Sequence, residues 1–150
     1  MAELLFYHLQ RRPLEAVLPF LLQKTLERGW RAIVQGRTTE RLQALDDHLW
    51  TYDEEGFLPH AMDGEPGTAQ EPVLLTTGAA NPNGAAVRFL IEQAAMPDDL
   101  SPYARIVVMF DGEDPEALAA AREEWRKARA NGNEATYWQQ DDRGRWEKKA

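Results

Sequence analysis

Three arginines beside a tryptophan, near the C-terminal end of the chain, form the pattern with the clearest chemistry. Arg122, Arg126 and Arg129 are spaced by four and three residues, so on a helix they form one row. Trp125 lies next to that row, on a stripe of mostly apolar residues. Guanidinium groups bind carboxylates through paired hydrogen bonds, and an indole ring packs against apolar side chains. The pattern fits recognition of an acidic peptide; the alternative is that Trp125 is a core residue and the arginines pair with neighbouring glutamates or with solvent.

A second candidate surface involves two aromatic residues, Trp50 and Phe57. Phe57 stands between the acidic turn Asp53–Gly56 and Pro59, a setting typical of neither a helix nor a sheet core. Its ring either folds back beneath the loop or stays exposed as an anchor for a partner protein. Trp50 precedes it by seven residues, at the end of a predicted helix, so the two rings could share one apolar patch. The pattern leaves these alternatives open.

The residue types of common catalytic and metal sites are scarce. The chain has 3 histidines, none paired at a metal-binding spacing, and 0 cysteines, which excludes thiol catalysis and thiolate metal sites. The segment Gly78–Gly84 follows a predicted strand as a phosphate-binding loop would. It lacks the Lys-Ser/Thr pair of a Walker motif and the third glycine of a dinucleotide fingerprint. We therefore predict no catalytic residue, metal or cofactor, and the alternative is an α/β small-ligand or nucleotide-binding enzyme domain with its site at this loop.

Charge and composition narrow the class of partner. The net charge is -8, but residues 121–150 hold 8 basic and 6 acidic residues, whereas residues 1–120 hold 9 and 19. Duplex DNA needs a concentrated basic surface, so contact with DNA is expected only indirectly. No apolar run approaches the roughly 20 residues of a membrane-spanning helix, and the N-terminus has no secretory signal pattern. These features predict a cytoplasmic protein with no membrane partner.

Alternating strand and helix patterns predict an α/β fold. Apolar runs predict strands at residues 3–8, 31–35, 73–76, 86–91 and 105–110, with a closing hairpin at 135–140 and 145–148. Amphipathic spacing predicts helices from Pro13 to Gly29, from Thr39 to Trp50, and from Asp114 to Ala130. The connection from Thr51 to Pro72 has no regular pattern and is expected to run over the surface. We expect one domain over residues 1–150, with a mostly parallel sheet, helices on both faces, and the strand before Asp111 near its middle.

Four short motifs are typical of one known family. They are the opening strand Phe6-Tyr7-x-Leu9, the helix end Leu49-Trp50, the segment Phe57-x-Pro59-His60, and the helical segment Ala121-Arg122-Glu123-x-Trp125-Arg126. In this order and spacing, over nearly the whole chain, they resemble the chi subunit of bacterial DNA polymerase III. The resemblance implies a Rossmann-like α/β fold that is not used to bind nucleotides. It also implies an accessory subunit of the clamp-loader assembly in DNA replication, which has no catalytic activity of its own.

The resemblance implies two partner surfaces. One would bind the psi subunit, which tethers chi to the clamp loader, through Phe57 with Trp50 nearby. The other would bind the acidic C-terminal tail of single-stranded-DNA-binding protein. In the family that site uses an arginine and an aromatic residue of the last long helix, here matched by Arg122 and Trp125, and Arg126 matches a neighbouring basic position.

The chain also departs from the family pattern. Leu118 stands where a basic residue is usual, one turn before Arg122, so one expected contact to the tail is missing. Trp125 replaces the usual tyrosine, which keeps a ring and loses the hydroxyl. The segments Tyr137-Trp138 and Arg145-Trp146 lie past the family's common end and receive no role from the resemblance. A peptide-binding module outside replication remains a further alternative on the sequence alone.

Overall fold

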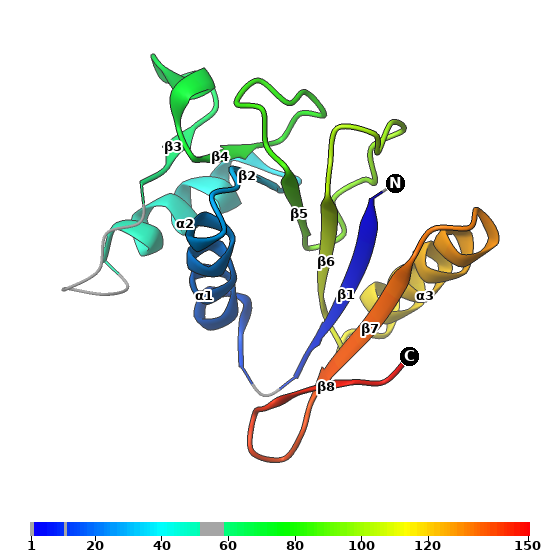
Figure 1. Cartoon of the computed structure of the whole chain (residues 1–150). Helices are drawn as coiled ribbons and strands as arrows, with labels where there is room; N and C mark the ends of the chain where they lie inside the picture. The colour runs from blue at the N-terminus through cyan, green and yellow to red at the C-terminus, as the bar shows by residue number, and fades with distance from the viewer. Residues whose placement is uncertain (1, 11, 52–58) are drawn as a thin grey trace.

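The computed structural model describes residues 2–10, 12–51 and 59–150, which contain an eight-stranded sheet (Figure 1). The strands lie in the order β3-β4-β2-β5-β6-β1-β7-β8, and all neighbouring pairs are parallel except the C-terminal hairpin β7–β8. Their bounds are β1 (Glu3–Leu9), β2 (Ala32–Gln35), β3 (Ala61–Met62), β4 (Val73–Thr76), β5 (Val87–Ile91), β6 (Arg105–Asp111), β7 (Ala135–Gln140) and β8 (Trp146–Lys148). The predicted α/β fold is confirmed, and β6 lies in the interior of the sheet as predicted.

Three helices cover the two faces of this sheet. The helices are α1 (Leu14–Glu27), α2 (Thr39–Thr51) and α3 (Pro115–Ala130). Helices α1 and α2 lie on one face and α3 lies on the other (Figure 1). Since β6 leads through α3 to β7, which lies beyond β1, α3 crosses the sheet over β6, β1 and β7. The arrangement is Rossmann-like, with helices on both faces as predicted.

The alternation of side chains along β1 explains how one strand contributes to the core on each face of the sheet. Leu9 joins the core beneath α1 and α2, and Tyr7 packs against the same core. Leu4 and Phe6 belong to the core beneath α3. Successive strand residues point to opposite faces, so one strand supplies both cores. The even-numbered side chains of β1 therefore meet the helix that carries Arg122 and Trp125.

The connection between α2 and β4 differs from the prediction. A two-residue strand, β3, pairs with β4, and a 3-10 helix, η1 (Thr68–Gln70), follows it. His60, Ala61 and Met62 are buried, so this part of the connection is not a surface loop. A strand of two residues is too short to produce an alternating pattern, which is why sequence periodicity missed it. Phe57 lies outside the described residues.

Within the described ranges, no helix is both long enough and apolar enough to cross a membrane.

Candidate functional site

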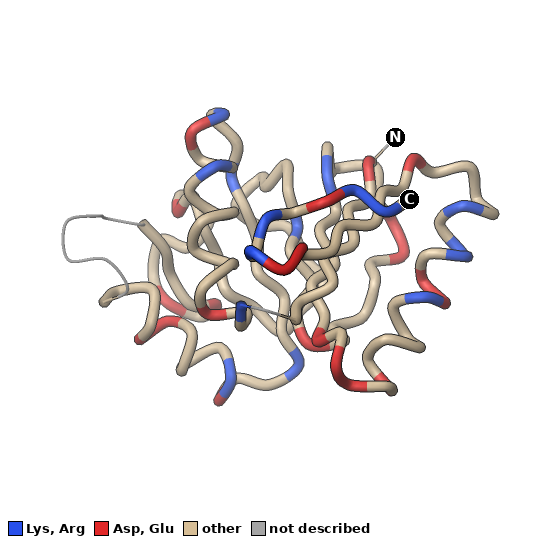
Figure 2. Tube along the Cα trace, turned by 90° about the horizontal axis from the view of Figure 1, so that it is seen from below, with Lys and Arg blue, Asp and Glu red and all other residues tan. Residues whose placement is uncertain are grey.

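Helix α3 carries a basic and aromatic stripe beside the side that it packs against β1 and β7. Its start is fixed by Asp114, whose side chain accepts hydrogen bonds from the backbone N–H groups of Glu116 and Ala117. Small residues on one side pack tightly against the sheet: Ala117, Ala121 and Ala128. That packing leaves the neighbouring stripe at the surface, and Figure 2 shows its Lys and Arg positions along the helix.

Trp125 is half-buried and held by contacts with two strands. Its ring centroid lies 5.6 Å from that of Phe6 and 6.0 Å from that of Tyr137, both edge-to-face. The guanidinium of Arg129 lies 5.4 Å from the centroid of the indole, in a cation–π contact. The ring thus packs against the core, as the alternative interpretation of the sequence expects, and its exposed part lies beside Arg129.

Arg122 lies on the same face as Trp125 and is exposed. Among the residues that the structure describes, none forms a hydrogen bond or ion pair with its guanidinium group. Its positive charge contributes to lowering the pKa of His8, after the larger effect of burial. Burial raises the pKa of Tyr137, and Arg122 partly opposes that rise. Within the described ranges Arg122 is therefore a cation without an ion-pair partner, and its charge acts on two strand residues.

Arg126 lies one turn further along α3 in a different setting. Its Nη1 is 3.6 Å from Glu123 Oε2, and both side chains are largely exposed. Lys127 and Glu124 form a similar exposed pair, with 3.9 Å between Nζ and Oε1. Exposed pairs of this kind contribute roughly 0–1 kcal/mol, so Arg126 can exchange its partner at little cost.

Sequence analysis missed two residues of this face, His8 and Tyr137. The Nδ1 atom of His8 lies 2.7 Å from the hydroxyl oxygen of Tyr137. The two residues are 129 positions apart, and the pairing of β1 with β7, with Phe6 opposite Tyr137, brings them together. Strand register cannot be derived from local periodicity, so no pattern in the sequence could have shown this contact.

Trp50 lies on the other side of the molecule, at the end of α2. Its side chain is 52% exposed, and its ring centroid is 4.3 Å from that of His60. The Nε2 atom of His60 is 3.1 Å from Asp46 Oδ1. Burial raises the pKa of Asp46, and the nearby His60 opposes that rise. The buried imidazole thus supports one side of an exposed indole, while Phe57 lies outside the described residues.

The loop Gly78–Gly84, the site of the alternative enzyme function, is anchored by a buried arginine. Arg88 donates hydrogen bonds to the carbonyl oxygens of Gly78 and Ala80, the latter at 3.0 Å. The backbone N–H of Gly78 donates to Thr76 Oγ1 at 3.0 Å. A phosphate-binding loop directs several N–H groups at its ligand, whereas this loop directs two carbonyl groups at an internal cation. The loop geometry gives no support to phosphate binding.

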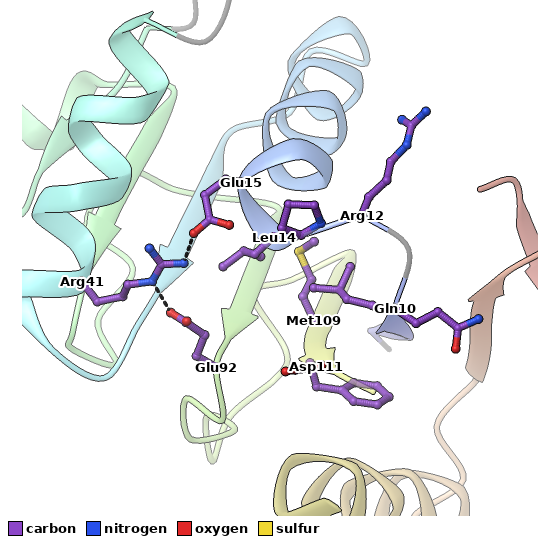
Figure 3. Close-up of a pocket in the computed structure, with 11 residues that line it drawn as sticks. Gln10, Arg12, Leu14, Glu15, Arg41, Glu92, Met109 and Asp111 are labelled. Atoms are coloured by element: carbon purple, nitrogen blue, oxygen red, sulfur yellow. Dashed lines mark hydrogen bonds and ion pairs between the residues drawn. The ribbon is translucent and has the colours of Figure 1, made fainter. Parts of the chain in front are cut away.

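A cleft of about 400 Å³ lies at the carboxyl ends of β1 and β6, beside the start of α1. In open α/β sheets this edge is the usual place for ligands. Here Arg41 is held between Glu15 and Glu92, the latter at 2.8 Å, as Figure 3 shows. Two carboxylates occupy the guanidinium group of Arg41, so this cation is not available to bind a phosphate. The described part of the chain holds no group of three or more side chains that could bind a metal ion.

Comparison with known proteins links the chain to one family. Residues 1–136 match the sequence profile of the family described as DNA polymerase III chi subunit, HolC. A probable DNA polymerase III subunit chi from Rickettsia prowazekii is 22% identical over 117 residues, which cover 74% of this chain and 71% of the relative. The DNA polymerase III subunit chi of Pseudomonas aeruginosa is 28% identical over 114 residues, covering 75% of this chain and 76% of the relative.

Proposed function

The chain belongs to the DNA polymerase III chi subunit family, and on that premise we propose that it links the clamp loader to single-stranded-DNA-binding protein during DNA replication. As an accessory subunit of DNA polymerase III, it has no catalytic activity of its own. Each of the two surfaces, one on α3 and one at Trp50, would bind one protein partner. The chain would contact DNA only indirectly, through these partners.

The observation that carries the proposal is the exposed guanidinium of Arg122, which has no partner among the described residues, next to the half-buried ring of Trp125. A free C-terminal carboxylate would accept two parallel hydrogen bonds from Arg122. The last apolar side chain of the same peptide would pack against the indole of Trp125. Arg126 and Arg129 would attract acidic residues further upstream in the tail through weaker, salt-screened interactions.

Trp50 supports the second half of the proposal. A large aromatic ring that is 52% exposed is the type of residue that dominates the affinity of protein interfaces. It lies at the end of α2, on the opposite side of the sheet from α3, so the two surfaces do not compete for space (Figure 1). We propose that Trp50, with Phe57, binds psi or an equivalent clamp-loader protein.

The experiment uses single-stranded DNA coated with the cognate single-stranded-DNA-binding protein and fixed to beads. The chain should be retained on the coated DNA and lost when that protein lacks its acidic C-terminal tail. Retention should also be lost with the variant R122A. Equal retention with and without the tail, or retention on uncoated DNA, would refute the proposed link.

A further inference from the structure

The imidazole ring of His8 is fixed at the carboxyl end of β1 beneath α3. Its centroid lies 5.4 Å from that of Phe110 and 5.9 Å from that of Tyr137. On one side of the ring, Nδ1 is 2.7 Å from the hydroxyl oxygen of Tyr137. The ring is therefore held both by aromatic contacts and by a hydrogen bond between Nδ1 and the Tyr137 hydroxyl.

The other nitrogen atom, Nε2, faces the backbone of Gly112 between β6 and α3. A Cβ atom placed on Gly112 would lie 1.8 Å from Nε2, so only glycine leaves room for the ring here. Within the described residues the only hydrogen bond of the His8 side chain is the one at Nδ1, and the residue is 9% exposed. Nε2 therefore keeps its hydrogen-bonding capacity for a molecule that reaches this edge of the ring.

Three charged or titratable groups face the ring from the elements around it. Arg122 approaches from α3, Asp111 from the end of β6, and Tyr137 from β7. Burial and then Arg122 lower the pKa of His8, while Asp111 partly opposes them. In the unbound protein at neutral pH, His8 is thus a neutral ring, and the cation that acts on it has no ion-pair partner in the described part of the chain.

We propose that the terminal carboxylate of the acidic tail binds between the guanidinium of Arg122 and Nε2 of His8, with Tyr137 holding the ring in place. The inference rests on the proposed function, because it adds two residues to the tail-binding site. With a neutral ring, the Tyr137 hydroxyl donates to Nδ1 and the Nε2–H group donates to the carboxylate. With a protonated ring, Nδ1–H donates to the Tyr137 oxygen, and Nε2–H still donates to the carboxylate.

This arrangement makes tail binding depend on pH. A carboxylate near the ring favours the imidazolium form and also neutralises Arg122, so the pKa of His8 rises on binding. The affinity therefore increases as the pH falls between the pKa of the complex and the pKa of the free protein. The carboxylates of the tail remain ionised in that range, because their ordinary pKa is about 4.

The first test measures the titration of His8 by NMR between pH 5 and pH 8. The probe is an acidic peptide that ends in Pro-Phe with a free carboxylate, and the control is the same peptide with an amidated C-terminus. The free-acid peptide should raise the pKa of His8 by about half a unit or more, and the amidated peptide should not. An unchanged His8 titration at saturating free-acid peptide would overturn the inference.

The second test compares peptide affinity for wild type, H8Q and Y137F by calorimetry at pH 5.5 and pH 7.5. Wild type should bind several-fold more tightly at pH 5.5, whereas H8Q should lose most of that gain. Y137F keeps the ring that packs against Trp125 but loses the hydroxyl that holds His8. Its gain in peptide affinity from pH 7.5 to pH 5.5 should be smaller than that of wild type. If H8Q shows the same pH dependence as wild type while R122A fails to bind, only the role of His8 is wrong. If wild type binds no peptide at either pH, the proposed function itself fails.

Discussion

The indole of Trp50 lies 4.3 Å, centroid to centroid, from the imidazole of His60, so an exposed aromatic ring rests on a buried one. His60 is in turn 3.1 Å from the carboxylate of Asp46 on the same helix as Trp50. The contact orients Trp50 without burying it, which is the arrangement needed by a residue that binds a partner.

The first prediction concerns W50A. Trp50 is 52% exposed and the variant loses its contact with His60, so the unfolding free energy should fall by only about 1 kcal/mol. Its affinity for the clamp-loader partner should fall at least tenfold, or about 1.4 kcal/mol. The matched control is F20A, which removes the other large exposed ring of the described residues, 53% exposed on α1. Urea unfolding and a binding titration measure the two effects, and equal partner affinities of W50A and F20A would contradict the assignment.

The second prediction concerns the close approach of His8 to Gly112. In G112A the added methyl group would overlap the imidazole and push the ring out of its place. Overpacking of this kind costs about 1–3 kcal/mol in unfolding free energy. In the double variant H8A/G112A the clash is gone, so the combined loss should be smaller than the sum of the two single losses. Additive losses in urea unfolding would show that the two residues do not interact.

The third prediction concerns the buried side chain of Arg88. Its guanidinium donates to Gln35 Oε1 at 2.8 Å and to the Tyr103 hydroxyl at 3.0 Å, besides the two loop carbonyls. R88M would leave these acceptors buried without a donor, which should lower the unfolding free energy by about 3 kcal/mol or more. R88K should not restore the loss, because a single ammonium group cannot reach acceptors on several sides. If R88M has the same urea unfolding midpoint as wild type, Arg88 is not an internal anchor of the fold.

Much of the fold could be predicted because the local signals agree with the tertiary structure. The Asp114-Pro115 start and the Asn131-Gly132 end bound α3, and the nearly continuous apolar run of β6 indicated an interior strand. Arg122 and Trp125 could be placed on one face because helical periodicity fixes their relative positions. His8 could not be added to them, because its position depends on which strand pairs with β1. The two-residue strand β3 is likewise defined by its pairing with β4 and not by its own sequence.

The fourth prediction concerns the ion pairs of Arg41. Burial tends to raise the pKa of Glu15, but its hydrogen bonds and the charge of Arg41 outweigh this effect and hold the pKa below 4.5. Glu15 therefore stabilises the fold above its unfolded-state pKa, and this contribution is lost as the pH falls through the folded-state pKa. R41M should be less stable than wild type by about 1 kcal/mol at pH 7, since both pairs are partly exposed. The difference in unfolding free energy between R41M and wild type should become smaller when urea unfolding is measured below pH 4.5. A difference that becomes larger in acid would contradict the prediction.

The central claim is that Arg122 binds the terminal carboxylate of the tail of single-stranded-DNA-binding protein. The measurement is a calorimetric titration of the free-acid tail peptide and its amidated form into wild type, R122A and R126A, at low and high salt. Wild type should bind the free acid with a dissociation constant in the micromolar range, about -8 kcal/mol. R122A and the amidated peptide should each lose about 2–3 kcal/mol of that affinity, and together they should lose little more, because both remove the same contact. R126A should lose less than about 1 kcal/mol and mainly flatten the salt dependence. If folded R122A binds the free acid as wild type does, the tail does not bind at this face of α3.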